Sequence, residues 1–364
     1  MASYITCSKY FGIRFVIHTV MMITKQPENS SISEYKAITR NALIENADID
    51  FDLYLSNGAN GHANYILFCR GDEQFSQERR DVLLKRNIDK LFISTEDTEK
   101  YLKYQEKNLK NIVQDRKISS TEKSIIVYDV ARNIIADLLN DPKSGQNTER
   151  ASEWVNNTVN HILNDEDTLA SLFHVLSNNY HVYTHSINVT VIGLLFGKSL
   201  SLKEHDLNCL GAGLLLHDIG KVIVPSNVIN KSSRLTEDEF NAIKHHPKAG
   251  LDHLEYRGNI DSRSLKVVIQ HHENYDGSGY PYNISGNKIH LFGRIARIID
   301  VYDAMTSNRS YAAAKRPFAT LAEMKGKMSN CFDGELLKEF ICFLGPSKDQ
   351  REKPRKDDKI YDVN

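Results

Sequence analysis

HHENYDGSGYP, residues His271–Pro281, is the stretch that decides how the second half of this chain is read. Two adjacent histidines on a helix point about 100° apart, so a single apolar face cannot bury both rings. Asp276-Gly277 and Gly279 predict a turn, and Pro281 prevents a helix from continuing. The stretch therefore predicts a helix end whose two imidazoles face a ligand, with a metal ion and a phosphate group as the candidates.

Histidines are concentrated around this stretch. Twelve of the 14 lie between His161 and His290, which is about a third of the chain. Because histidine is the commonest metal ligand, this distribution assigns the chemistry to the second half.

Composition sets wider limits. At 364 residues the chain is long enough for two domains, and its 41% hydrophobic and 26% charged residues are typical of a globular protein. The net charge of -1 gives no electrostatic reason to expect a nucleic-acid polymer or an anionic membrane as partner. Five cysteines without a CxxC pair argue against a disulfide framework and predict a cytoplasmic location.

Other metal-ligand candidates recur along the second half. A lone buried histidine is usually structural, but His217 is followed directly by Asp218 at the end of an apolar helix, where an unpaired charge would cost several kcal/mol. At intervals of 25 to 32 residues, each about one helix pair, come the further candidates His185, His246, His271-His272 and Asp303. Five imidazoles and two carboxylates exceed the needs of one metal. They suit two metals that share Asp218 as a bridge, with Fe or Mn favoured and Zn, Ni or Mg less so.

These segments resemble the HD-GYP family, a branch of the HD-domain metal-dependent phosphohydrolases. In order, the chain reads HDIGKVIVPSNVI, LTEDEFNAIKHHPKAG, HHENYDGSGYP, RIARIIDVYDAMTS and NRSYAAAK, and the resemblance covers about Ser152 to Met324. It implies an α-helical bundle that hydrolyses cyclic di-GMP to linear pGpG, and further to GMP in some cases. The attacking group would be a hydroxide held between two divalent metals.

The resemblance also implies roles for single residues. Asp218 would bridge the metals and orient the hydroxide, and Lys221 would reach the phosphate or assist the leaving oxygen. The expected substrate contacts are Gly279, Tyr280, Pro281, Asp276, Lys315 and Arg309.

The chain departs from the family pattern in three places. His181 stands where some members have a glutamate for a third metal, so His181 is a weak candidate ligand and two metals are expected. Asn274 replaces a frequent arginine after HHE, and Ala312 replaces a basic residue that commonly contacts phosphate. These changes leave the ligand set intact and bear on substrate affinity.

The first half predicts a small α/β domain without a catalytic constellation, so we expect it to be regulatory. A helix is expected over Glu34–Asn46 and another from a Ser76 cap to Lys85. Strands are expected near Phe51–Leu55, Tyr65–Cys69 and Leu91–Ile93, and two further helices over Glu96–Gln114 and Glu122–Asn140. The expected divisions are a leader (1–30), the α/β domain (31–118), a helical linker and loop (119–147), the HD-GYP domain (148–345) and a charged tail (346–364).

Partners and alternatives stay open at this point. The stripe Ile126, Val130, Ile134 and Leu138 fits either an internal core or a homodimer seam. The apolar stretch 11–23 is too short for a membrane span. Besides a cyclic di-GMP phosphodiesterase, the sequence allows a catalytically weak effector that signals through protein partners, or an enzyme for another cyclic dinucleotide.

Overall fold

The computed structural model describes residues 34–345, apart from residues 60–61, 143, 166, 169–170, 173–174, 176–184, 230, 232, 234, 256–259 and 308–313. The predicted leader and charged tail lie outside the described residues. The described chain forms two compact units that divide between Val175 and Leu176, here called the first unit and the second unit.

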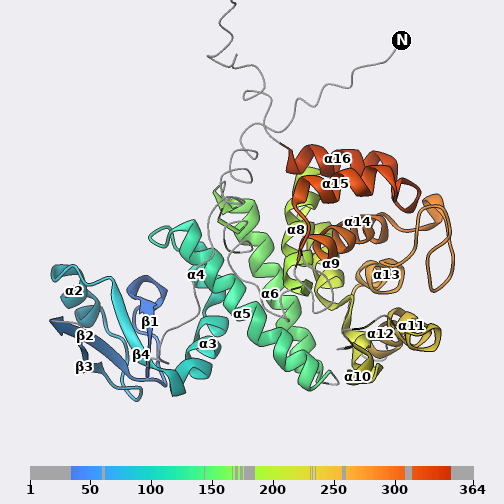
Figure 1. Cartoon of the computed structure of the whole chain (residues 1–364). Coiled ribbons are helices and arrows are strands. Elements are labelled where there is room, and N and C mark those ends of the chain that lie inside the picture. The colour runs from blue at the N-terminus through green and yellow to red at the C-terminus, as the bar shows by residue number, and fades with distance from the viewer. Residues whose placement is uncertain are drawn as a thin grey trace, which may run out of the picture. The chain divides into compact units, whose positions relative to one another are not determined.

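A four-stranded antiparallel sheet lies in the first unit (Figure 1). Its order is β1 (Tyr35–Thr39), β4 (Lys90–Ser94), β2 (Leu53–Ala59) and β3 (His62–Cys69). The helix expected over residues 34–46 is wrong, because β1 pairs with β4 along its whole length and only a single 3-10 turn follows it. The hydrogen bonds that decide this conformation come from a strand about fifty residues away, which a local pattern does not reveal.

Helices complete the first unit. As predicted, α2 (Gln77–Lys85) begins after Ser76, whose hydroxyl accepts the amide hydrogen of Arg79. The single helix expected over 96–114 is divided at Asn108 into α3 (Thr98–Lys107) and α4 (Leu109–Gln114). The long helices α5 (Ser120–Asn140) and α6 (Gly145–Asn164) then pack on each other.

The apolar stripe of α5 is buried within the chain. Ile126, Val130, Ile134 and Leu138 are each at most 3% exposed. Nearby, the indole of Trp154 on α6 donates to the carbonyl of Val127 on α5 at 2.8 Å. These observations favour the internal-core interpretation of the stripe. They also put both helices in the first unit, whereas the predicted domain boundary at residue 148 runs through α6.

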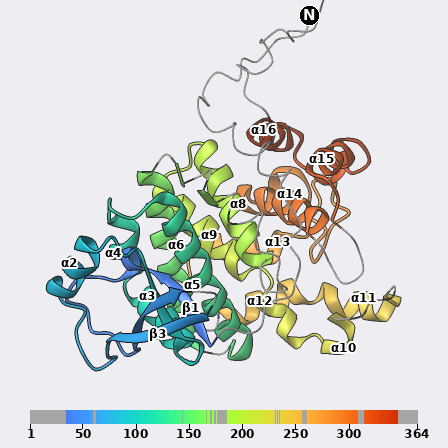
Figure 2. The ribbon, with the colours of Figure 1, turned by 60° about the vertical axis from the view of Figure 1, so that its left-hand side comes forward.

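The second unit is helical and contains a ring of four helices. They are α8 (His185–Ser199), α9 (Glu204–Leu216), α13 (Ser262–Gln270) and α14 (Leu291–Thr306). Each contacts the next, and α14 closes the ring on α8, as Figures 1 and 2 show. Around the ring lie α10 (Ser226–Ile229), α11 (Glu237–Lys244), α12 (His246–Glu255), α15 (Pro317–Gly326) and α16 (Gly334–Leu344). The predicted fold class, mostly α with a small α/β N-terminal domain, is confirmed.

One close approach positions the loop after α9. Gly220 lies in the 3-10 turn η3 (Ile219–Ile223), which packs on α12. A Cβ atom at Gly220 would lie 2.0 Å from the carbonyl oxygen of His246 and 2.5 Å from the amide nitrogen of Gly250. Only glycine allows these backbones to meet, and their contact holds Asp218 beside His246.

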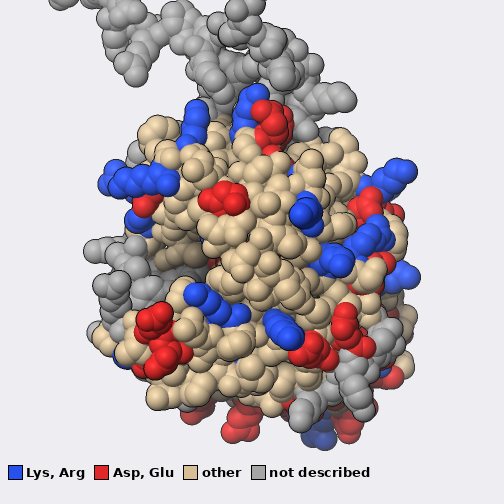
Figure 3. Space-filling model, turned by 90° about the vertical axis from the view of Figure 1, so that its right-hand side faces the viewer, with Lys and Arg blue, Asp and Glu red and all other residues tan. Residues whose placement is uncertain are grey.

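The surface gives no sign of one dominant charge on the face of Figure 3, where basic and acidic side chains are interspersed. No described helix combines the length and apolar character that crossing a membrane requires.

Candidate metal centre

Helix ends supply most of the predicted ligands. His217 caps the C-terminus of α9 and His271 that of α13, while His246 and His185 are the first residues of α12 and α8. The ring of helices and α12 therefore bring side chains from distant parts of the sequence to one place. His217, His246 and His271 are each at most 1% exposed.

Backbone hydrogen bonds fix how three of these rings are protonated. Nδ1 of His217, His246 and His271 lies 2.6, 2.7 and 2.9 Å from the carbonyl oxygens of Leu214, Ile243 and Val268. A carbonyl oxygen only accepts hydrogen bonds, so Nδ1 carries the hydrogen and Nε2 of the neutral ring presents a lone pair. Such backbone contacts are typical of histidines that bind metals through Nε2.

The three Nε2 atoms converge on one carboxylate. They lie 3.4 Å (His217), 3.3 Å (His246) and 3.8 Å (His271) from oxygens of Asp218. In addition, Nε2 of His246 lies 3.1 Å from Nε2 of His271. Lone pairs and a carboxylate repel one another at these distances unless a cation lies between them.

The candidate ligands fall into two neighbouring groups. Asp218 joins His246, His271 and His272 in one group, and His185, His217 and Asp300 form the other. Asp218 faces both, because its Oδ1 is nearest to His246 and its Oδ2 to His217 and His185. This arrangement agrees with the expectation that Asp218 bridges two metals, although the number and identity of the metals stay predictions.

The pKa values of the site residues also fit a metal centre. Burial alone raises the pKa of Asp218, but the adjacent His217 and Lys221 outweigh it and hold the pKa well below its usual value. Burial lowers the pKa of His272 to about 3, and burial with the neighbouring imidazoles lowers that of His271 well below its usual value. The site thus holds the ionised carboxylate of Asp218 beside the neutral imidazoles of His271 and His272.

His185 shows how strongly the site attracts a cation. Burial alone lowers its pKa, but hydrogen bonds to Asp300 and Asp303 outweigh burial and raise it to about 9. A proton on His185 is one way to balance these carboxylates, and a metal ion is another.

Asp300, which the sequence reasoning missed, takes the position expected for Asp303. Its Oδ1 lies 3.3 Å from Nε2 of His185 and its Oδ2 lies 3.8 Å from Nδ1 of His272. Asp303 instead contacts the opposite side of the ring, with its Oδ2 2.7 Å from Nδ1 of His185, and it accepts hydrogen bonds from Asn188 and Ser307. The two carboxylates lie one turn apart on α14, so their spacing alone does not tell which of them faces the centre.

These residues fit a metal centre. Nε2 of His217 and Oδ1 of Asp218 are buried and have no hydrogen-bond partner among the described residues. A buried polar atom without a partner is costly, and a bound divalent metal would satisfy both. The mixture of imidazole and carboxylate donors suits first-row transition metals.

The remaining site residues are placed in different ways. Lys221 donates from its ammonium group to Oδ2 of Asp218 at 2.6 Å. The ring of Tyr280 stacks on that of His272, with centroids 4.7 Å apart. Asp276 accepts hydrogen bonds from the amide and the hydroxyl of Ser278, so its visible role is in the turn.

Lys315 does not contact the centre in this structure. Its ammonium group donates to Glu323 at 2.6 Å, and its expected phosphate contact stays a prediction. Two other expected residues, His181 and Arg309, lie outside the described residues, as does Ala312.

The loop that carries Tyr280 is held by residues that the sequence reasoning left without a role. Glu273 is 1% exposed, and its Oε1 accepts the amide hydrogen of Tyr282 at 2.7 Å. Asn274 accepts from Nε of Arg297 at 2.9 Å and donates to Ser278 at 2.9 Å. Where the family often has an arginine, this chain has Asn274, and Arg297 from α14 braces the loop through it.

Fold and site together define a class of protein: an α-helical bundle with a buried histidine–aspartate centre that can hold metal ions. The sequence pattern of the HD domain family matches residues 133–336, more than half of the chain. The chain therefore belongs to the HD domain family.

Similar proteins support the HD-GYP resemblance, which is confirmed. The cyclic di-GMP phosphodiesterase PA4108 of Pseudomonas aeruginosa is 30% identical over 220 residues, covering 59% of this chain and 52% of that protein. The 3'3'-cGAMP-specific phosphodiesterase 3 of Vibrio cholerae is 32% identical over 151 residues, covering 42% and 33%. The matched segments thus span about half or less of these relatives.

A solved structure supports the fold. Bd1817, an HDG"Y"P protein from Bdellovibrio bacteriovorus, superimposes with a TM-score of 0.59 at 18% identity, covering 85% of this chain and 99% of that one. At this identity the likeness concerns the fold alone.

Proposed function

We propose that this protein is a metal-dependent phosphodiesterase that hydrolyses cyclic di-GMP to pGpG. The observation that carries the proposal is the convergence of three Nε2 lone pairs on the buried carboxylate of Asp218, with a second carboxylate, Asp300, beside them. The names of the similar enzymes support the substrate class.

Five histidines and two aspartates would hold the metals: His185, His217, Asp218, His246, His271, His272 and Asp300. Divalent metals in such a centre supply positive charge to a phosphate and lower the pKa of bound water. The protein contributes the fixed imidazole orientations, which need no rearrangement when charge develops on the phosphate.

Two further side chains act on the substrate. Lys221 is 34% exposed and fixed by Asp218, so its ammonium group can reach a phosphate oxygen and donate a proton to the leaving oxygen. Tyr280, stacked on His272, offers a ring face beside the centre for a guanine base or a ribose. Together they position one phosphodiester bond beside the metal-binding residues.

A second substrate deserves a direct comparison. One of the relatives described above is specific for 3'3'-cGAMP, which differs from cyclic di-GMP in one purine base. The contacts proposed for Lys221 and Tyr280 are to phosphate and to a ring face rather than to base edges, so they favour neither dinucleotide. This observation keeps 3'3'-cGAMP as the second candidate.

The test is metal content by elemental analysis, paired with turnover of cyclic di-GMP, 3'3'-cGAMP and a simple phosphate monoester on the same anaerobic sample. Asp218→Asn should lose metal together with activity, by about a hundredfold or more. Asp252→Asn, an exposed carboxylate on α12, serves as the control and should behave as the wild type.

The outcomes separate the alternatives. Metal without turnover of any dinucleotide would favour an effector that binds cyclic di-GMP and acts through partners. Full turnover by Asp218→Asn would contradict the proposal.

A further inference from the structure

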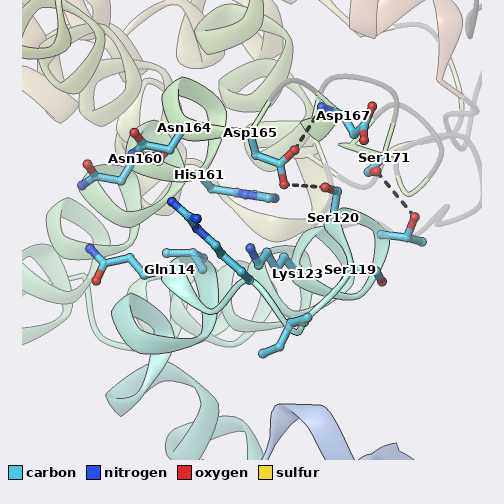
Figure 4. Close-up of a pocket in the computed structure, with 14 residues that line it drawn as sticks. Gln114, Ser119, Ser120, Lys123, Asn160, His161, Asn164, Asp165, Asp167 and Ser171 are labelled. Atoms are coloured by element: carbon cyan, nitrogen blue, oxygen red, sulfur yellow. Dashed lines mark hydrogen bonds between the residues drawn. The ribbon is translucent and has the colours of Figure 1, made fainter.

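A pocket of about 880 Å³ lies in the first unit, and its lining includes none of the residues of the metal centre. All fourteen residues that line it belong to that unit (Figure 4). They come from the end of α4, the loop after it, the start of α5, the end of α6 and the segment 165–171 that follows α6. Its volume is that of a small-molecule site.

Lys123 is the feature that distinguishes this pocket. The residue is 6% exposed, and it lines the pocket (Figure 4). Within the described part of the chain, its ammonium group forms no hydrogen bond and no ion pair. The stem of this side chain is covered while its ammonium group opens into the pocket, so an anion in the pocket can form charge-assisted hydrogen bonds with it.

The start of α5 adds donors next to Lys123. Ser119 caps this 21-residue helix and satisfies the amide of Glu122. The amides of Ser120 and Thr121, both in the pocket lining, have no hydrogen-bond partner among the described residues. The first amides of a long helix carry partial positive charge and bind phosphate groups well.

Arg116, in the loop before α5, brings a second cation to the rim of the pocket. Arg116, Lys123 and the start of α5 together offer the charge-assisted donors that a phosphate group accepts from.

The carboxylates of the pocket indicate which groups the ligand carries besides its phosphate. Asp165 accepts a hydrogen bond from the hydroxyl of Ser120, as Figure 4 shows, and one from the amide of Asp167 at 3.0 Å. Burial alone raises the pKa of Asp165, but these hydrogen bonds outweigh it and lower the pKa. Asp165 is therefore ionised, and together with Asp167 it calls for hydroxyl or amino donors on the ligand.

From this combination we propose that the pocket binds a small phosphate monoester that carries hydroxyl or amino groups, such as a phosphorylated sugar. The phosphate contacts Lys123, Arg116 and the start of α5, and the donors of the ligand face Asp165 and Asp167. This makes the first unit a ligand-binding module, independent of what the metal centre hydrolyses.

Calorimetric titration of the full chain tests the site with three probes: ribose 5-phosphate, ribose and inorganic phosphate. Ribose 5-phosphate should bind, inorganic phosphate should bind more weakly, and ribose should not bind. Lys123→Met keeps the length and burial of the side chain but removes the charge, and it should weaken ribose 5-phosphate binding about tenfold or more. Lys110→Met, an exposed lysine on α4, should bind as the wild type does.

Thermal stability provides a second readout. Without ligand, Lys123→Met should melt at about the same temperature as the wild type, because the ammonium group that it removes forms no ion pair within the described part of the chain. Added ribose 5-phosphate should raise the melting temperature of the wild type and leave that of Lys123→Met unchanged. Should Lys123→Met fail to fold, Arg116→Gln, at an exposed position, should show the same loss of binding.

Phosphate can also bind at a metal centre, so the titrations are repeated in chains that carry Asp218→Asn. Loss of ribose 5-phosphate binding on Asp218→Asn alone would assign the binding to the metal centre and overturn the proposal. Unchanged binding by Lys123→Met, an equal loss in Lys110→Met, or no binding of any phosphate probe would overturn it as well.

Discussion

Asp300 and Asp303 stand one helical turn apart on α14 and contact His185 from opposite sides. Asp300 meets the Nε2 side, where the other candidate ligands converge, and Asp303 accepts from the Nδ1 side. A carboxylate in the second position orients the ring and raises its basicity without contacting the metal. Comparing Asp300 with Asp303 therefore distinguishes a carboxylate that binds the metal from one that only orients the ring of His185.

We expect Asp300→Asn to remove bound metal and turnover together. Asp303→Asn should retain metal, with affinity lowered about 10- to 100-fold, and should lose only part of its turnover. Metal titration of both variants, followed by assays at saturating metal, separates the two effects. The reverse order, with Asp303→Asn losing metal and Asp300→Asn keeping it, would restore Asp303 as the ligand.

His290 gives a pH prediction outside the centre. It caps α14, and its Nδ1 accepts the amide hydrogen of Phe292 at 3.1 Å. Burial lowers its pKa, and Lys266, Arg263 and Arg294 lower it further. The folded protein therefore binds this proton less readily than the unfolded chain, whose histidine pKa is about 6.5.

The free energy of unfolding should consequently fall as the pH drops below about 6.5, by at most about 1.4 kcal/mol per pH unit from this group. His290→Asn can still cap the helix but does not titrate. Denaturation of the wild type and His290→Asn between pH 8 and pH 5.5 measures the difference in their free energies of unfolding. The contributions of the other histidines are the same in both proteins and cancel in this difference. An identical pH dependence in the two proteins would refute the assignment.

At the scale of elements, the contact between η3 and α12 determines whether Asp218 and His246 meet. Gly220→Ala places a methyl group against the backbone of α12. We expect a loss of about 1–3 kcal/mol or more in the free energy of unfolding, accompanied by weaker metal binding because His246 is displaced. Urea denaturation and metal titration measure the two effects.

Gly326→Ala is the control, because nothing lies within 4 Å of its Cβ position. This substitution at the end of α15 should leave the free energy of unfolding unchanged or raise it by up to about 1 kcal/mol. Equal stability of the two alanine variants would mean that η3 adjusts freely against α12.

For the whole molecule, the question is whether the two units unfold separately. Trp154, the only tryptophan, is buried in the first unit, so its fluorescence reports on that unit, while far-UV circular dichroism reports on both. A ligand stabilises only the unit that binds it when the units are independent.

We therefore expect a chelator to lower the melting transition seen by circular dichroism and to leave that of Trp154 fluorescence in place. The chelator-treated protein reloaded with metal is the reference. If both signals shift together, the units unfold as one cooperative body.

The sequence was sufficient wherever the signal was local or tied to chemistry. The cap at Ser76 and the strand at Leu91–Ile93 were predicted because their patterns lie within a few residues. Six of the seven expected ligands meet in the structure, because histidines next to carboxylates in apolar helices have few other uses. The strand at Tyr35–Thr39 was missed, since its partner β4 lies far along the chain.

By itself, the sequence determined the family, the helical class and the residue types of the centre, because these follow from side-chain chemistry and short-range periodicity. Only the tertiary structure decided that Asp300 rather than Asp303 faces the other ligands, that Lys315 pairs with Glu323, and that Lys123 lines a pocket with no ion-pair partner among the described residues. Each of these depends on which side of a helix meets its neighbours and how close they come. Packing between distant segments sets that geometry, and no local pattern encodes it.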